Sequence, residues 1–172
     1  VTSGMHGYGG SPYRSFQRST QAHNTVYIEG EEQLDCWSTF RVARRGKMLW
    51  TLWEPYQEGQ LFAGKYQLYS GTTHSRAIYI LPDKGFLCLD FVEAQSQKDI
   101  YSLIHLHPST DVKVINSYVL LECDKIKISM HPFENEVIQI IAGSYSPQQG
   151  WYSEFFGTAI PNPVIVLKKT SG

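Results

Sequence analysis

Residues 125–131 read Lys-Ile-Lys-Ile-Ser-Met-His, a strict alternation of polar and apolar side chains. Successive side chains of a β-strand point to opposite faces of its sheet, so a period of two predicts a strand with one apolar face. We expect Ile126, Ile128 and Met130 to lie on that face and to contact a core. The segment therefore predicts β-structure, and its neighbours along the chain extend the same pattern.

Further short β-rich runs lie on both sides of this segment, and turn-forming residues such as those at 82–85 and 116–117 separate them. The predicted strands are 48–53, 61–69, 77–81, 86–92, 100–107, 112–115, 118–123, 137–141 and 164–167. No window shows sustained helical periodicity with capping residues. Strands of this length and spacing predict an all-β fold in which antiparallel sheets pack face to face as a β-sandwich.

The length of 172 residues fits a single domain, 1–172, with room for a sizeable core. The net charge of -1 gives no global electrostatic reason to expect binding to nucleic acid or to an anionic membrane. No apolar stretch approaches the roughly 18 residues of a membrane span. The three cysteines form neither a disulfide framework nor a CxxC metal site.

Residues 18–33 read Arg-Ser-Thr-Gln-Ala-His-Asn-Thr-Val-Tyr-Ile-Glu-Gly-Glu-Glu-Gln, a polar loop that carries His23 and runs into a short strand. Thr25 to Ile28 are strand formers, and Gly30 allows the turn that follows. The stretch resembles the R-S-T-x-A-H-N-T-V-x-[VI]-[DE]-G-x-x-Q signature of the heparinase II/III-like polysaccharide lyases, in their C-terminal β-sandwich domain. A match of this length is far more specific than a three-residue motif.

Further segments match the same family in the same order, so the resemblance covers essentially the whole chain. They are Val1-Thr2-Ser3-Gly4, Tyr8, Tyr13, Arg14 and Phe16, then Trp37, Phe40, Arg41, Val42, Arg44 and Arg45, then His74 with Arg76, Leu106-His107-Pro108, Gly150-Trp151-Tyr152-Ser153, Phe156-Gly157 and Ile160-Pro161. The resemblance implies a sandwich of the super-sandwich type that follows an α/α-toroid domain in a full-length protein. It also implies export by a bacterium, to the periplasm or as a secreted protein.

The activity that the resemblance implies is β-elimination on a uronate-containing, anionic polysaccharide such as a glycosaminoglycan or alginate. A base takes the C5 proton beside the uronate carboxylate, and the 4-linked oxygen leaves. In the family the proton-transfer groups lie in the toroid or upstream of the region matched here, so no catalytic residue is assigned. We expect this chain to form one wall of the substrate cleft and to be inactive alone. The alternative is a non-catalytic carbohydrate-binding or structural module.

The resemblance implies that His23 is a metal ligand, usually for zinc. Its partners in the family are a histidine of an upstream H-x-H-x-D element, which these residues lack, and an aspartate whose position corresponds to Thr2. Zinc takes about four ligands. We therefore expect that a zinc site, where one exists, needs residues of the full-length parent, and that this chain alone does not bind a metal tightly. Without the resemblance, the simpler interpretation is a histidine bonded to backbone at the mouth of a strand.

Five further residues are candidates for substrate binding: Tyr8, Tyr13, Arg14, Arg18 and Asn24. Arginine can grip carboxylates or sulfates with paired donors, and sugar rings stack on tyrosine. The alternatives are a glycine-rich surface loop with solvated charges and, for Asn24, a turn that starts the strand. We interpret Arg41, Arg44 and Arg45 as solvated charges, and the pairs His74 with Arg76 and His105 with His107 as structural.

Overall fold

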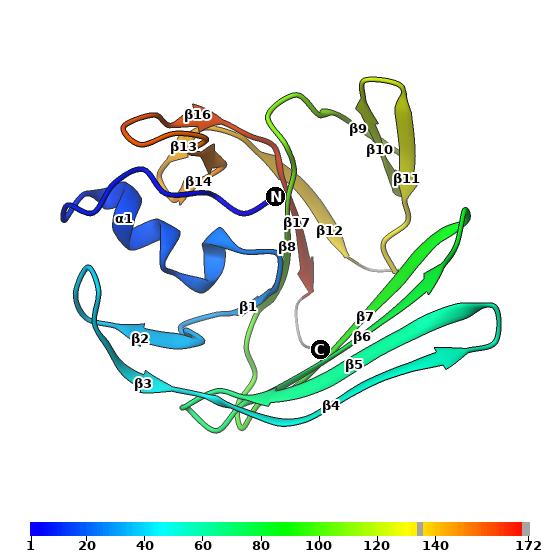
Figure 1. Cartoon of the computed structure of the whole chain (residues 1–172), viewed down its shortest axis with the longest axis horizontal. Coiled ribbons are helices and arrows are strands. Elements are labelled where there is room, and N and C mark those ends of the chain that lie inside the picture. The colour runs from blue at the N-terminus through cyan, green and yellow to red at the C-terminus, as the bar shows by residue number, and fades with distance from the viewer. Residues whose placement is uncertain (134–135, 170–172) are drawn as a thin grey trace.

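The computed structural model describes residues 1–133 and 136–169, and strands dominate it (Figure 1). This confirms the predicted all-β class with antiparallel sheets. Two short helical elements lie near the N-terminus, α1 (Pro12–Gln17) and η1 (Thr20–Ala22). Among the described residues, no helix is long and apolar enough to cross a membrane.

Three larger sheets form the body of the domain, and the strand pairs within them are antiparallel. The central sheet has the order β1 (Val26–Ile28), β8 (Ile100–His105), β17 (Val164–Lys169), β12 (Val137–Ile141). The second has the order β4 (Lys47–Tyr56), β5 (Gly59–Gln67), β6 (Thr73–Leu81), β7 (Gly85–Glu93). The third has the order β11 (Ile126–Met130), β10 (Tyr118–Cys123), β9 (Asp111–Ile115).

Short two-stranded ladders complete the described structure. They are β2 (Leu34–Cys36) with β3 (Val42–Arg45), β13 (Ser144–Tyr145) with β14 (Gln148–Gln149), and β15 (Trp151–Tyr152) with β16 (Ile160–Pro161). Each strand range predicted from the sequence overlaps one of the observed strands. Strand β5 ends before the predicted limit because the Leu68 N–H donates to the Thr72 carbonyl (2.8 Å) and Gly71, with a φ of 98°, turns the chain.

The short helix α1 lies in a part of the chain where the sequence showed no sustained helical periodicity. Ser11 caps it, because the Arg14 N–H donates to the Ser11 hydroxyl oxygen at 3.2 Å, and Pro12 occupies the first turn. Both are strong helix-start signals. Phe16 is buried and anchors the helix on the domain. The segment is too short for helical periodicity to be seen. The Ser11-Pro12 pair is therefore the sequence signal that indicates this helix.

The core is centred on β17, which is buried on both faces. Its alternate residues belong to two apolar clusters. Val164 and Val166 lie with Leu103 in one cluster, and Ile165 and Leu167 lie with Val119 of β10 in the other. The central sheet is therefore an inner layer. One face meets the β9–β11 sheet, and the other carries His105, whose ring contacts the Gln21 carbonyl of η1 at 2.9 Å.

The expectation that the 126–130 strand faces a core is wrong for two of its three apolar residues. Ile126 is 64% exposed and Ile128 is 51% exposed, whereas Met130 packs on the cluster of Val119, Ile165 and Leu167. Strand β11 is at the edge of its sheet, and only its Met130 end, paired with Val119, reaches the central layer. The rest of the hairpin projects away from it (Figure 1).

The β4–β7 sheet carries large apolar side chains on both faces. One face has Met48, Trp53, Ile80 and Phe86 among its exposed residues, and the other has Trp50, Leu52, Leu87, Leu89 and Phe91. At the end of the sheet nearest β1, Tyr66 and Val92 pack on the cluster of Val26, Ile28 and Leu68. The sheet is thus attached to the central layer at one end and exposes apolar surface beyond it.

Candidate functional site

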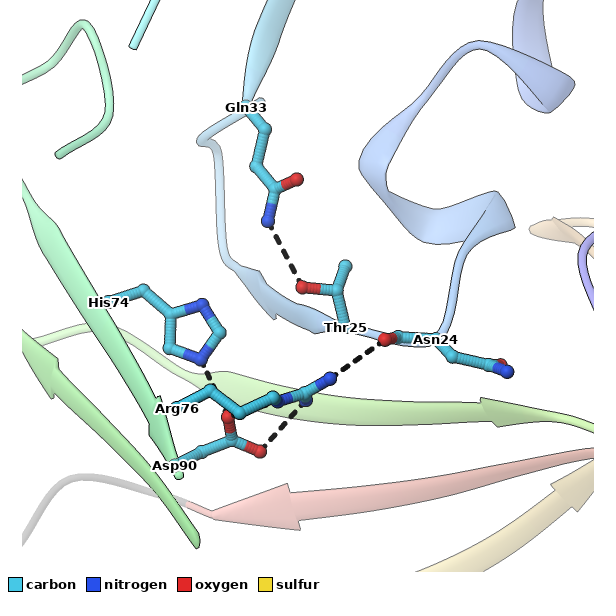
Figure 2. A network of polar contacts seen from close by, with 6 residues as sticks. All are labelled: Asn24, Thr25, Gln33, His74, Arg76 and Asp90. Carbon is cyan, nitrogen blue, oxygen red and sulfur yellow. Dashed lines mark hydrogen bonds and ion pairs between the residues drawn. The ribbon is translucent and has the colours of Figure 1, made fainter. Parts of the chain in front are cut away.

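The His23-Asn24-Thr25 segment joins η1 to β1, and different parts of the fold hold it. The Thr25 carbonyl accepts from the Leu103 N–H of β8 at 3.0 Å. The Asn24 carbonyl accepts from Nη1 of Arg76, on β6, at 2.8 Å. The Thr25 hydroxyl accepts from Nε2 of Gln33 at 3.1 Å (Figure 2). The segment is therefore fixed between the central sheet and the β4–β7 sheet.

The side chain of Asn24 also takes part in holding this segment. Its Oδ1 accepts the backbone N–H of His105 at 2.7 Å, across 81 positions of sequence. One of the two polar atoms of the predicted binding residue Asn24 is thus bonded within the fold. The amide nitrogen is the atom of this side chain through which the predicted sugar contact can still be made.

Beneath the segment lies a polar network built on neighbouring strands (Figure 2). Arg76 of β6 donates to both carboxylate oxygens of Asp90 on β7, at 2.7 and 2.9 Å. Nε2 of His74 lies 2.6 Å from the same carboxylate. The carboxylate is only 17% exposed, so it depends on these partners for compensation of its charge.

The charges of this network stabilise each other. Burial alone raises the pKa of Asp90, but the hydrogen bonds from His74 and Arg76 outweigh it, so its pKa lies below the ordinary value. Burial likewise lowers the pKa of Arg76, and the bonds to Asp90 reverse this, so its pKa is raised. The pair is therefore ionised at neutral pH. Its sequence signal was the His-x-Arg spacing on one strand face, which we interpreted as structural.

His23 itself is exposed at the surface. Partial burial of its ring lowers the pKa, while the Gln17 backbone and the charge of Glu32 act in the opposite direction. The lowered pKa favours the neutral imidazole at pH 7, which is the form that binds a metal or accepts a proton. Within residues 1–133 and 136–169, no three His, Cys, Asp or Glu side chains are grouped so that they could hold a metal ion.

An aromatic patch, Tyr8, Phe40 and Phe156, lies on the surface beside α1. The Tyr8 ring is 5.6 Å from Phe40 and 4.9 Å from Phe156 between centroids. The guanidinium of Arg14 lies 5.8 Å from the Phe40 ring centroid and donates to the Thr39 carbonyl at 3.0 Å. Arg14 therefore connects α1 to the loop between β2 and β3, next to three exposed aromatic rings.

Two other predicted residues are held in different ways. Arg18 donates to the Ser38 carbonyl in the same loop as the Arg14 contact. Tyr13 lies in a second aromatic group, stacked on His6 at 4.7 Å with its hydroxyl 3.3 Å from that of Tyr145. That hydrogen bond is the main cause of the raised pKa of Tyr13. The structure thus brings Tyr8, Arg14 and Arg18 to one loop and places Tyr13 apart from them.

A groove of about 470 Å³ runs over the β4–β6 strands next to the polar network. His74 and Arg76 line it together with Met48, Trp53, Phe62, Tyr66 and Ile78. Trp53 and Phe62 stack within it at 5.3 Å. This groove could not be predicted from the sequence, because its residues come from three strands whose register is set only in the folded sheet.

The family model of the heparinase II/III-like C-terminal domain matches residues 1–169. The chain belongs to this family. The match confirms the resemblance drawn from the His23 segment, and the context of this heparinase II/III-like domain is that of polysaccharide lyases. No relative among curated proteins matches the chain.

Solved structures of heparinases have the same fold as this heparinase II/III-like domain. Heparan sulfate lyase HepC from Pedobacter heparinus superposes with a TM-score of 0.76 at 15% identity, over 98% of this chain and 25% of its own. Two heparinase III structures give TM-scores of 0.72 and 0.67 at 16% identity, over 99% and 95% of this chain and 25% and 23% of theirs. The chain therefore spans about a quarter of the length of these proteins.

Proposed function

We propose that this chain is the C-terminal β-domain of a polysaccharide lyase and forms one wall of a cleft for an anionic, uronate-containing polysaccharide. Family membership supports the lyase context. The observation that carries the proposal is the way in which the segment with His23 is held. An exposed imidazole is presented on a segment that is bonded to two sheets, as a binding group requires.

The surface near α1 suits a polymer of charged sugars. Arg14 and Arg18 use one donor group each on loop carbonyls. The Nε of Arg14 is buried, so carboxylates or sulfates would bind the other guanidinium N–H groups of the two residues. Tyr8 is 54% exposed and offers a ring face for a pyranose. Heparan sulfate, the substrate class in the name of the HepC protein, carries both kinds of anion.

The chemistry needs a base for the C5 proton, an acid for the leaving oxygen and a group that neutralises the carboxylate. We propose that the toroid of the parent protein supplies the acid, the base and the neutralising group. The part assigned to this chain is to bind the polymer and orient it. The parent, as a processor of extracellular polysaccharide, would be periplasmic or secreted.

Zinc is the metal that the family resemblance implies, and His23 would be its ligand here. The donors in the described residues fit this role only in part, because one imidazole is present where about four ligands are needed. Thr2, at the position of the expected aspartate, has a neutral hydroxyl and is a poor zinc ligand. The described residues therefore do not provide a complete zinc site.

Thr2 also favours the second candidate, a carbohydrate-binding or structural β-sandwich without a role in chemistry. The two candidates differ in what the parent protein does. In the lyase, His23→Ala in the parent should lower the rate at which unsaturated uronate forms, measured by its ultraviolet absorbance. A parent that binds polysaccharide and shows no such absorbance with heparan sulfate or alginate would support the module instead.

The isolated chain tests the binding part of the proposal. Calorimetric titration with heparan sulfate oligosaccharides should show weak binding that Arg14→Ala reduces. Arg44→Ala is the matched control, because the described contacts of Arg44 are with Asp35 and Tyr69 and not with the rings of the aromatic patch. Equal affinity in all three proteins would contradict the assignment of Arg14. No ultraviolet absorbance is expected to develop with this chain alone.

A further inference from the structure

We propose that Arg76 is a positioning residue for His23, and that it acts through the carbonyl of Asn24. The inference deepens the proposed function and rests on it only for the role of His23. Arg76 lies on β6, 52 positions along the sequence from Asn24, and donates to its carbonyl at 2.8 Å. Asn24 follows His23 directly, so this bond fixes the backbone from which the imidazole projects.

The guanidinium is held so that it can carry out this task. Its Nε and Nη2 are both bound to the carboxylate of Asp90, and Nη1 remains for the Asn24 carbonyl. A rigid planar group whose other donors are fixed loses little further freedom when the third bond forms. His74, 8% exposed at its side chain, contacts Asp90 in turn and limits the movement of the carboxylate.

Other bonds to the segment come from nearby parts of the chain, such as the Gln33 amide on the Thr25 hydroxyl, and from the central sheet. The His105 N–H on Asn24 and the Leu103 N–H on Thr25 both belong to β8 in the central sheet. Arg76 supplies the contact from the β4–β7 sheet, so the segment is held from two directions (Figure 2). Loss of the Arg76 bond would release the Asn24 carbonyl, so the backbone next to His23 could shift. The His23 N–H on the Thr20 carbonyl and the Thr25 N–H on the His23 carbonyl would limit that shift.

Arg76→Lys is the variant that isolates this role. A lysine ammonium can still neutralise Asp90, so the carboxylate is not left buried and unpaired. It cannot reproduce the fork that binds Asp90 twice and the Asn24 carbonyl at the same time. Arg44→Lys is the matched control, since Arg44 also binds a carboxylate, that of Asp35 at 2.7 Å, and lies on β3.

Nuclear magnetic resonance of the ¹⁵N-labelled chain provides the test. In Arg76→Lys we expect changed ring nitrogen shifts for His23 and amide exchange that is about tenfold faster at His105 and Leu103. Amides of β10, such as that of Val119, should keep their exchange rates, and Arg44→Lys should match the wild type throughout. Unchanged His23 shifts, or equal acceleration at all these amides, would overturn the inference and leave the pair a general stabilising contact.

Binding of heparan sulfate oligosaccharide separates this inference from the proposed function. If the wild type binds, Arg76→Lys should weaken binding about threefold or more while the chain stays folded, and Arg44→Lys should not. If the wild type does not bind, the proposed function fails. The resonance experiment then still decides whether Arg76 positions His23, because it depends on geometry alone.

Discussion

The backbone N–H of His105 donates to the side-chain oxygen of Asn24 at 2.7 Å. This bond joins a residue at the end of β8 to the residue that follows the exposed His23. It therefore links the central sheet directly to the candidate site. Because His105 is 1% exposed, its N–H has no solvent to replace a lost partner. The stability of the fold and the geometry of the site are therefore linked at Asn24.

Removal of the Asn24 side chain should be costly for this reason. In Asn24→Ala the buried N–H of His105 is left without its acceptor, and we expect the free energy of unfolding to fall by about 1–3 kcal/mol. Urea denaturation followed by circular dichroism gives the value. Asn24→Asp keeps an oxygen at the same place and serves as the control. A loss of the same size in both variants would argue against the hydrogen bond as the cause.

The stability of the chain should decrease in mild acid because of His105. Burial lowers the pKa of His105 to about 4, with smaller effects from the Gln21 backbone, the N-terminus and His23. An unfolded histidine has a pKa of about 6.5 and binds protons first, so stability is full above that pH and falls as the pH drops towards 4.

From these two pKa values the free energy of unfolding should be about 2 kcal/mol lower at pH 5 than at pH 8. Urea denaturation of the wild type and of His105→Gln at several pH values checks this. The variant should lose most of this pH dependence, whatever its stability at pH 8. An unaltered dependence in His105→Gln would assign the effect to other groups.

Two isoleucines give a matched comparison of core and surface. Ile165, fully buried in β17, should lose about 2–5 kcal/mol of stability on change to alanine, because a cavity remains. Ile126, 64% exposed in β11, should change stability by less than about 0.5 kcal/mol on the same substitution. Chemical denaturation of both variants measures the difference. A large loss at Ile126 would mean that the hairpin packs against something in solution.

Zinc binding by the chain should be weak. His23 supplies one of about four ligands, so calorimetry at micromolar protein should show no stoichiometric site. Tight binding that disappears in His23→Ala would reveal ligands that the described geometry does not group together. Tight binding that survives this substitution would place the metal at another histidine.

The strands of the three larger sheets could be predicted, because alternation and turn residues mark them locally. The short strands β2, β3 and β13 to β16 were not predicted, because runs of two to four residues carry too little pattern. The burial of a strand is not local. Ile126 stands in an alternating run that predicts one face against a core, yet it is exposed at a sheet edge. Ile165 stands in the continuous apolar run 164–167 and lies inside the central layer. Helix α1 was missed because a helix of six residues is too short to show periodicity, although Ser11 and Pro12 mark its start.

The candidate site could also be predicted only in part. His23 could be singled out because the family signature surrounds it. The bonds that hold its segment come from Arg76 and His105, which are 52 and 81 positions away from Asn24 in sequence. A histidine two residues before an arginine predicts a shared strand face, but not that the arginine reaches another sheet. Only the folded register brings these groups together.

The apolar surface of the β4–β7 sheet has an optical consequence. Trp53 is 74% exposed and Trp50 is 48% exposed, on opposite faces of that sheet. The other two tryptophans, the exposed Trp37 and the buried Trp151, lie outside it. The emission of the chain should therefore be dominated by hydrated indoles and lie at long wavelength. A molecule that binds to one face of the sheet would shield Trp50 or Trp53 from water and shift the emission to shorter wavelength. Trp50→Phe and Trp53→Phe would then tell which face was covered, so the sheet contains its own probe for whatever packs on it.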